Sequence, residues 1–388
     1  MRIAHIITRM IVGGAQENTL LCCQDLVRIY GDDVLLVTGP SLGPEGSLLK
    51  SDEDPGVRVR EVSQLRRAIH PWRDLSSYVT LKRILREFQP DVVHTHSAKG
   101  GMLGRMSAKS MNVPAIVHTV HGAPFHPYQG IAARTFFQWC ERFAAKQCHK
   151  MVSVADAMTD LLVEASVASR EKFLTVYSGM DVGPFLNANH DRESAREELG
   201  FNSEHIVIGK IARLFHLKGH EYLISAARAV VDANPQVRFV LVGDGILRER
   251  LENDINTAGL RDHFHFTGLV PPTRIPALLG AMDILVHTSL REGLARTLPQ
   301  ALIAGKPVVS YDIDGAREVV ISGETGFLIP PKTVDPLAHA MIKLSADQSL
   351  RERLGQEGRE RFTDQFRHET MTRQLREIYE RVLAENGA

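Results

Sequence analysis

Charged side chains at the ends of two predicted strands could hold a diphosphate and a polar group beside it. Arg213 follows an apolar run, and Lys218 stands five positions later. Glu292 follows a second apolar run, 284–286, and precedes Gly293. Fixed cations neutralise the charge of a diphosphate, and a carboxylate accepts strong hydrogen bonds from hydroxyl groups. This combination suits a neutral polyol carried on a diphosphate, which is a sugar nucleotide.

The elements around these residues place them at one edge of a sheet. A helix is predicted over 297–304 after the loop of Glu292, and the loop 312–315 leads into another helix. Ligands of doubly wound sheets bind outside the carboxyl ends of the strands. Backbone N–H groups at helix starts attract phosphate there, which makes Gly315 a second candidate contact.

The rest of the chain alternates short apolar runs with helical patterns. This rhythm predicts an α/β protein with parallel sheets and helices on both faces. The length of 388 residues suggests two domains. A polar, turn-prone stretch over 187–191 places the boundary near residue 186. We therefore expect one domain over 1–185 and a second over 186–366, followed by a terminal helix.

Composition excludes several classes of protein. The formal net charge is zero, so no nucleic-acid footprint is expected. The four cysteines imply no disulfide framework and favour a reducing cytosol. We expect neither a signal peptide nor a membrane span, so that any membrane contact would be peripheral. The sequence does not indicate an oligomeric state.

Five histidines gather around two predicted strand ends: His94, His96, His118, His121 and His126. They would either bind a metal ion or pack inside the fold. No cysteine joins them, and H-x-H on one strand lacks the carboxylate found in many metal sites, so we expect no metal. His121 differs from the others because it stands beyond its strand and precedes Gly122.

The first strand ends in a loop that contains Gly13 and Gly14 and leads into a helix predicted over 16–30. Adjacent glycines let the backbone approach a ligand, or they turn the chain for purely structural reasons. The loop lacks the G-x-G-x-x-G spacing of a dinucleotide site, which argues against an oxidoreductase built from two such domains.

The predicted helix 131–146 has an aromatic stripe at helical spacing. This stripe, made of Phe136, Trp139, Cys140 and Phe143, favours a core-facing surface. A membrane-surface role stays open because other apolar and basic side chains accompany it, namely Phe137, Arg134, Arg142 and Lys146.

The motifs resemble those of the retaining GT-B glycosyltransferases of family 4. That family has an E-x7-E motif, whose first acid corresponds to Glu292 and whose second position is occupied here by Gln300. Its R-x4-K-G pattern is complete at Arg213, Lys218 and Gly219. Looser matches are the Gly-Gly loop and the stretch 264–270, against which the nucleotide base rests in the family. The resemblance covers nearly the whole chain.

The resemblance implies two Rossmann-like domains that face a cleft, with a terminal helix over 367–383 that crosses back to the first domain. The first domain would bind the acceptor, and the second would bind a nucleotide-sugar, with UDP as the expected nucleotide. The sugar would pass to a hydroxyl of a glycan or lipid-linked glycan, in polysaccharide or glycolipid synthesis. No cofactor or metal is expected.

The resemblance also assigns roles to individual residues. Glu292 would meet donor hydroxyls, Gln300 would hold the ribose, and His121 would lie beside the donor sugar. The implied catalytic residues are Glu292, His121, Arg213 and Lys218. The implied donor-binding residues are Gly14, Arg213, Lys218, Leu269, Glu292, Gly293, Leu294, Ala295, Gln300 and Gly315.

Two other functions fit the same architecture. A sugar-nucleotide 2-epimerase would need no acceptor, so product analysis separates it from a transferase. An inactive sugar-binding homologue is suggested by Gln300 alone, and an assay of donor hydrolysis or transfer tests it.

Overall fold

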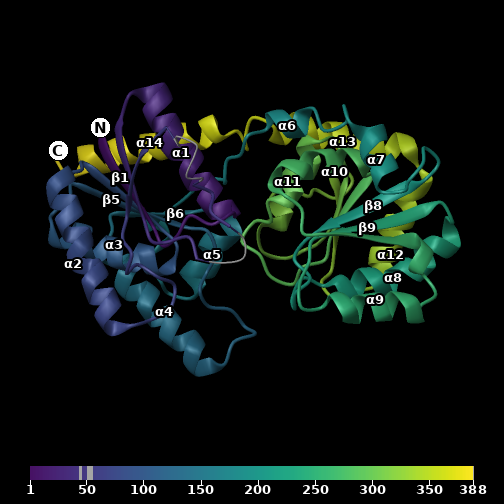
Figure 1. Ribbon diagram of the computed structural model, residues 1–388, viewed down its shortest axis with the longest axis horizontal. Helices are drawn as coiled ribbons and strands as arrows, with labels where there is room; N and C mark the ends of the chain where they lie inside the picture. Colours follow the sequence, from purple (N-terminus) through teal and green to yellow (C-terminus); the bar gives the residue numbers. More distant parts are fainter. Residues whose placement is uncertain (43–45, 50–55, 388) are drawn as a thin grey trace. The chain divides into compact units, whose positions relative to one another are not determined.

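A computed structural model describes residues 1–42, 46–49 and 56–387. The chain forms two compact units. Unit 1 comprises Met1–Met180 and the chain from Gln365 onward, and unit 2 comprises Asp181–Asp364. Each unit is a parallel sheet with helices on its faces, as the alternating pattern predicts (Figure 1).

Unit 1 contains a seven-stranded sheet in the order β3-β2-β1-β4-β5-β6-β7. Its strands are β1 (Arg2–Ile7), β2 (Asp33–Thr38), β3 (Arg58–Glu61), β4 (Val92–His96), β5 (Ala115–Val120), β6 (Lys150–Ser153) and β7 (Phe173–Thr175). Its helices are α1 (Gly14–Tyr30), α2 (Pro71–Phe88), α3 (Ala98–Ser110), α4 (Ile131–Ala145), α5 (Asp156–Glu164), the 3₁₀ turn η1 (Arg170–Lys172) and α14 (His368–Glu385).

Unit 2 contains a six-stranded sheet in the order β10-β9-β8-β11-β12-β13. Its strands are β8 (Ile206–Ile211), β9 (Val237–Val242), β10 (Phe264–Gly268), β11 (Ile284–His287), β12 (Val308–Tyr311) and β13 (Gly326–Ile329). Its helices are α6 (Gly183–Leu186), α7 (Arg192–Glu198), α8 (His220–Ala233), α9 (Arg248–Thr257), α10 (Ile275–Ala281), α11 (Thr297–Ile303), α12 (Asp335–Ala346) and α13 (Gln348–Phe362), with 3₁₀ turns η2 (Arg261–His263), η3 (Pro272–Arg274) and η4 (Asp314–Glu318).

The strand pairing explains the near-continuous apolar runs. Every described strand pair is parallel, and most central strands are buried along their length, which removes the polar alternation of a half-exposed sheet. In unit 1 the strand order reverses direction between β1 and β4, and in unit 2 between β8 and β11. Such reversals are where doubly wound sheets bind ligands.

The terminal helix returns to the first unit, as the resemblance implies. Met371, Leu375 and Tyr379 of α14 are buried in the unit 1 core together with Leu26 of α1. Figure 1 shows α14, in yellow, lying along the early elements of unit 1. The two ends of the chain therefore build one core.

One expectation about the helices was wrong. The aromatic stripe of α4 does not face the core: Phe136 and Trp139 are exposed, and the helix buries Glu141, Ala144 and Ala145 instead. Small side chains allow α4 to approach its neighbours closely, and Glu141 is buried because it pairs with Arg105 at 3.4 Å. The helix expected after the loop 312–315 is present as the short 3₁₀ helix η4, which contains Gly315.

All four cysteines are free. Within the described ranges, no helix has both the length and the apolar character needed to span a membrane.

Candidate functional site

The unit 2 site lies at the carboxyl ends of β8 and β11, which are neighbours in the sheet. Arg213 and Lys218 stand in the loop after β8, and Glu292 stands in the loop after β11. Two hydrogen bonds join these loops: the N–H of Leu290 donates to the carbonyl of Leu217 at 2.8 Å, and the Thr288 hydroxyl donates to the carbonyl of Gly219 at 2.6 Å. The sheet and these bonds bring the predicted cations and acid together.

Gly219 is required by this junction. Its φ is +66°, in the left-handed region that favours glycine. A Cβ at this position would lie 1.9 Å from the carbonyl oxygen of Thr288. The glycine of the R-x4-K-G pattern therefore lets the loop that carries Lys218 pass against the loop that carries Glu292.

Lys218 and Glu292 form an ion pair through Nζ and Oε1. The Nε2 atom of His287 lies 3.8 Å from the same carboxylate oxygen. Burial acts to raise the pKa of Glu292, but His287 and the charge of Lys218 outweigh it and hold the pKa at about 2. The side chain is therefore an ionised acceptor at any physiological pH.

Asp314 shapes the loop of Glu292 from the next strand end. Its Oδ2 accepts the N–H of Glu292 at 2.6 Å, and the N–H of Gly315 donates to the carbonyl of Gly293 at 3.0 Å. Burial raises the pKa of Asp314, although the bond from the Glu292 amide opposes this shift. Asp312, the other carboxylate of the D-x-D spacing, pairs with Arg317 at 3.0 Å. Both acids thus have structural partners.

The remaining predicted donor contacts of unit 2 lie around this edge. Arg213 is exposed, with its guanidinium 5.0 Å from the ring centre of Phe215. Leu294 and Ala295 are half-buried in the loop before α11, and Gln300 is half-buried on that helix. Leu269, just beyond β10, is 76% exposed and therefore accessible to a base.

Sequence reasoning missed Lys210, which lies inside β8 and is buried. Its Nζ donates to Thr288 Oγ1 at 2.8 Å. Burial and the nearby charge of Lys218 lower its pKa to about 7. A lysine in the middle of a buried strand was the available signal, because lysine is almost never fully buried without a partner. His287 was also missed.

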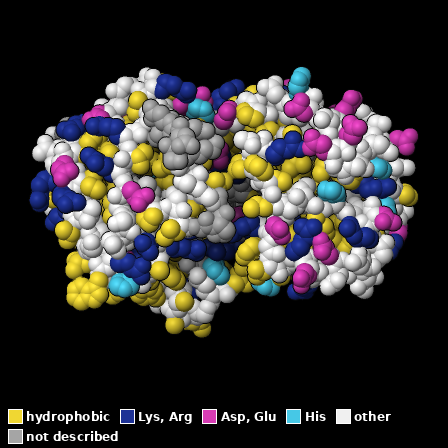
Figure 2. Space-filling model, in the orientation of Figure 1, with side chains coloured by type: hydrophobic (Ala, Val, Ile, Leu, Met, Phe, Trp, Pro, Cys, Tyr) yellow, Lys and Arg dark blue, Asp and Glu magenta, His cyan; other side chains and the backbone are white. Residues whose placement is uncertain are grey.

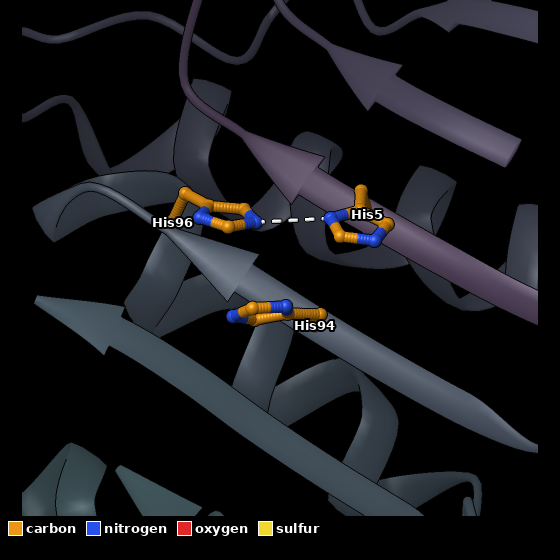
Figure 3. A group of neighbouring side chains, drawn as sticks. All are labelled: His5, His94 and His96. Atoms are coloured by element: carbon orange, nitrogen blue, oxygen red, sulfur yellow. Dashed lines mark hydrogen bonds between the residues drawn. The ribbon is translucent and has the colours of Figure 1, made fainter. Parts of the chain in front are cut away.

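A chain of histidines connects the strands of unit 1 (Figure 3). His5 Nδ1 lies 3.0 Å from His96 Nε2, and His96 Nδ1 lies 3.2 Å from His121 Nε2. His94 lies beside them, with Nδ1 2.5 Å from the Tyr379 hydroxyl and Nε2 2.7 Å from Thr119 Oγ1. We call His5, His96 and His121 the histidine relay.

The relay has a preferred direction. Burial lowers the pKa of His5 to about 3 and also lowers that of His96, so both rings are neutral and each has one N–H. His5 Nε2 is buried without a partner. Because an orphaned buried N–H is rarer than an unpaired acceptor, the proton of His5 belongs on Nδ1. His5 then donates to His96, and His96 donates to His121 Nε2.

The same histidines offer the geometry of a metal site. One ring nitrogen each from His5, His94 and His96 lies within 4.8 Å of the others. Hydrogen bonds account for every ring nitrogen of these three residues except His5 Nε2. That pattern favours packed, hydrogen-bonded rings over metal ligands. The absence of a metal remains a prediction.

The other unit 1 candidates flank the carboxyl end of the sheet. Gly14 is the first residue of α1, after the β1 loop. His118 lies in β5, where its Nδ1 contacts Thr95 Oγ1 at 2.9 Å, so it is a packed core residue. His121 is half-buried just beyond β5.

Comparisons with known proteins agree with this architecture. Residues 191–361 match the family model "Glycosyl transferases group 1", and residues 13–179 match "Glycosyl transferase 4-like domain". The Escherichia coli protein "UDP-Gal:alpha-D-GlcNAc-diphosphoundecaprenol alpha-1,3-galactosyltransferase" is 29% identical over 355 residues, covering 90% of this chain and 89% of that protein.

Two solved structures show the same fold. Anabaena HepE in complex with UDP superimposes with a TM-score of 0.82 at 23% identity, covering 98% of this chain and 100% of that one. Sucrose-phosphate synthase from Thermosynechococcus elongatus superimposes with a TM-score of 0.84 at 20% identity, covering 99% of this chain and 100% of that one. The chain is therefore a glycosyltransferase of the GT-B fold, in which the group 1 model matches unit 2 and the 4-like model matches unit 1.

Proposed function

We propose that this enzyme is a retaining glycosyltransferase that moves a hexosyl group from a UDP-sugar to an acceptor hydroxyl. The bond from the anomeric carbon to the diphosphate breaks with UDP as the leaving group. A bond from that carbon to the acceptor oxygen forms, and the proton of the acceptor hydroxyl is released. The observation that carries the proposal is the pairing of Lys218 with the ionised Glu292 at the reversal of the unit 2 sheet, with Arg213 in the same loop as Lys218. A sugar diphosphate needs both an anion contact and a hydroxyl acceptor at one place.

In this proposal the cations of unit 2 act on the leaving group. Lys218 and Arg213 contact the diphosphate and stabilise the charge that grows as the sugar departs. Glu292 accepts hydrogen bonds from donor hydroxyls, and Gln300 contacts the ribose. Gly293, Leu294, Ala295 and Gly315 line the donor, Leu269 meets the base, and Gly14 and His121 act from unit 1. No metal takes part.

The names of similar proteins support the donor and acceptor classes. The Escherichia coli relative is named for a UDP-linked donor and a diphosphate-linked lipid acceptor. HepE has been solved in complexes with UDP and with UDP-glucose. We extend these classes to the present chain as a UDP-sugar and a glycan or lipid-linked glycan. The Escherichia coli relative is named as a transferase, and none of these observations favours the epimerase.

Unit 1 carries exposed apolar and basic side chains that suit an anionic lipid surface. On α4, Ile131 and Trp139 are 85% and 60% exposed. Basic residues on and just after the same helix are also exposed, namely Arg134, Arg142 and Lys146. Figure 2 shows hydrophobic side chains gathered over the α4 region with Lys and Arg among them. We propose that this cytoplasmic enzyme contacts the inner membrane face through α4.

Product analysis tests the reaction. The full chain is incubated with UDP-sugars, with and without a lipid-linked glycan, and the products are identified. Transfer should require the acceptor, whereas an epimerase would convert the donor alone. Arg213→Ala and Lys218→Ala should each lower the transfer rate by the equivalent of roughly 2.7–4 kcal/mol. Arg228, exposed on α8, provides the control: Arg228→Ala should transfer at the wild-type rate.

Vesicle sedimentation tests the membrane contact separately. Trp139→Ser together with Phe136→Ser should reduce binding to vesicles that contain phosphatidylglycerol, without lowering the midpoint of thermal unfolding. Equal binding by the variant and the wild type would exclude α4 as the contact surface.

A further inference from the structure

Unit 1 contains a cavity of about 290 Å³ at the carboxyl edge of its sheet. Thr8 and Arg9, which follow β1, line one side of it. The loops after β2 and β3 and the first turn of α2, at Arg73, line the rest. The volume lies near the lower end of the range for small-ligand pockets.

The lining of this cavity combines arginine side chains with apolar ones. Four arginines contribute to it, namely Arg9, Arg66, Arg67 and Arg73, and no acidic side chain is among the described lining residues. Asp74, next to Arg73 in the chain, accepts two hydrogen bonds from Lys99 Nζ at 2.7 and 2.9 Å. That carboxylate is therefore already engaged. Arg9 Nη1 donates to the carbonyl of Leu42 at 3.0 Å, and Arg66 Nε donates to the carbonyl of Ser63 at 3.3 Å. These neutral acceptors hold the two side chains but do not cancel their positive charge.

The fold favours a ligand at this place. Thr8 Oγ1 lies 2.6 Å from Ser97 Oγ, which joins the ends of β1 and β4, where the strand order reverses. The cavity adjoins that reversal through Thr8. Arg73 belongs to the first turn of α2, an 18-residue helix whose N-terminus adds positive potential. The position of the cavity beside the strand-order reversal therefore indicates a ligand site, and its arginines indicate that the ligand is an anion.

We propose that this cavity binds the phosphate or diphosphate group of a phosphorylated acceptor. The inference rests on the proposed function and names the chemical class of its second substrate. Unit 2 has its own cations for the donor diphosphate, at Arg213 and Lys218. The arginines of unit 1 form a second group of cations, and we assign them to the phosphate of the second substrate, the acceptor. Guanidinium groups suit it because they bind phosphate oxygens bidentately.

Titration of the full chain with inorganic pyrophosphate tests the site without any transfer reaction. Arg9→Gln and Arg73→Gln should each weaken binding about tenfold. Arg86→Gln is the matched control, because Arg86 stands in the last turn of the same helix and the charge change is equal. Lys218→Ala, which alters the unit 2 site, should retain the binding that depends on Arg9 and Arg73.

A second measurement identifies the source of the phosphate. One glycan is offered as its diphosphate and as a neutral glycoside, and kcat/KM is measured for each. Arg9→Gln should lower kcat/KM about tenfold for the diphosphate and leave the neutral glycoside unchanged. Equal losses on both acceptors, or pyrophosphate binding that ignores Arg9 and Arg73, would overturn the proposal.

Vesicles separate a lipid headgroup from the acceptor. Suppose that Arg9→Gln loses binding to phosphatidylglycerol vesicles while its pyrophosphate binding stays intact. That result would assign these arginines to membrane binding and would also overturn the proposal that the cavity binds an acceptor phosphate. Absence of transfer by the wild type would instead refute the proposed function, and the pyrophosphate titration would still decide whether the cavity binds phosphate.

Discussion

Lys218 and His287 keep Glu292 ionised, whereas Gln300 has an uncharged amide side chain. Lys218 and His287 contact the Glu292 carboxylate, and Asp314 holds its amide. A charged acceptor makes hydrogen bonds roughly twice as strong as a neutral one, and removing it from a buried site leaves partners unpaired at about 1–3 kcal/mol. The two positions of the E-x7-E motif are therefore unequal.

We expect Glu292→Gln to nearly abolish transfer and Gln300→Glu to stay within about tenfold of the wild type, or 1.4 kcal/mol. Steady-state kinetics of both variants with the true donor measure this. Near-normal activity of Glu292→Gln with a dead Gln300→Glu would reverse the two roles.

The histidine relay makes a second prediction at this scale. If His5 donates to His96 and His96 to His121, then His121 is protonated on Nδ1, and ¹⁵N spectra of the histidine rings should show that tautomer. His5→Phe removes the donor at the start of the relay and should lower kcat/KM about tenfold. His5→Asn offers an amide N–H in place of Nδ1 and should recover most of the loss.

A buried histidine outside the relay provides the control. His118→Phe should lower stability without changing the His121 tautomer. An Nε2-protonated His121 in the wild type would contradict the direction of the relay. A metal ion bound by His5, His94 and His96 would show that the hydrogen-bonded arrangement is not the native one.

At the scale of elements, the site depends on how closely two loops approach each other. Gly219→Ala would put a Cβ 1.9 Å from the Thr288 carbonyl oxygen and would place alanine at a φ of +66°. The loops must separate, which displaces Lys218 from Glu292. We expect a lower midpoint of urea unfolding and a large loss of transfer.

Gly305→Ala is the comparison for this variant. Its φ is also positive, at +75°, but its Cβ would meet no atom within 4 Å. It should lose stability through backbone strain alone, about 1 kcal/mol, and keep its transfer rate. Equal transfer by both variants would show that the contact between the two loops is not needed for catalysis.

At the scale of the whole molecule, positive charge is supplied by the protein itself. Arg213 and Lys218 stand in the loop after one strand, while Asp312 and Asp314 are engaged by Arg317 and the Glu292 amide. We therefore expect transfer to survive EDTA at the wild-type rate. Loss of activity in EDTA, restored by Mg²⁺ or Mn²⁺, would assign a metal to these aspartates.

Local patterns in the sequence were enough to predict the strands of the sheets and the loops of the unit 2 site. A buried parallel strand is a short apolar run, and the residues that follow it stand at the carboxyl edge whatever the rest of the chain does. Arg213, Lys218 and Glu292 were found in this way. The periodicity of 131–146 likewise showed that an apolar face exists, although it could not show whether that face meets protein or solvent.

Only the tertiary structure decided which residues complete these sites. His5 contacts His96 across 91 positions, and Lys210 contacts Thr288 across 78. The arginines of the unit 1 cavity come from the ends of separate elements, including β1 and α2. Such partners share no local pattern, because strand order and register, set by the packing of the whole unit, choose which distant side chains meet. The same packing left the aromatic face of α4 exposed and buried Glu141 beside Arg105.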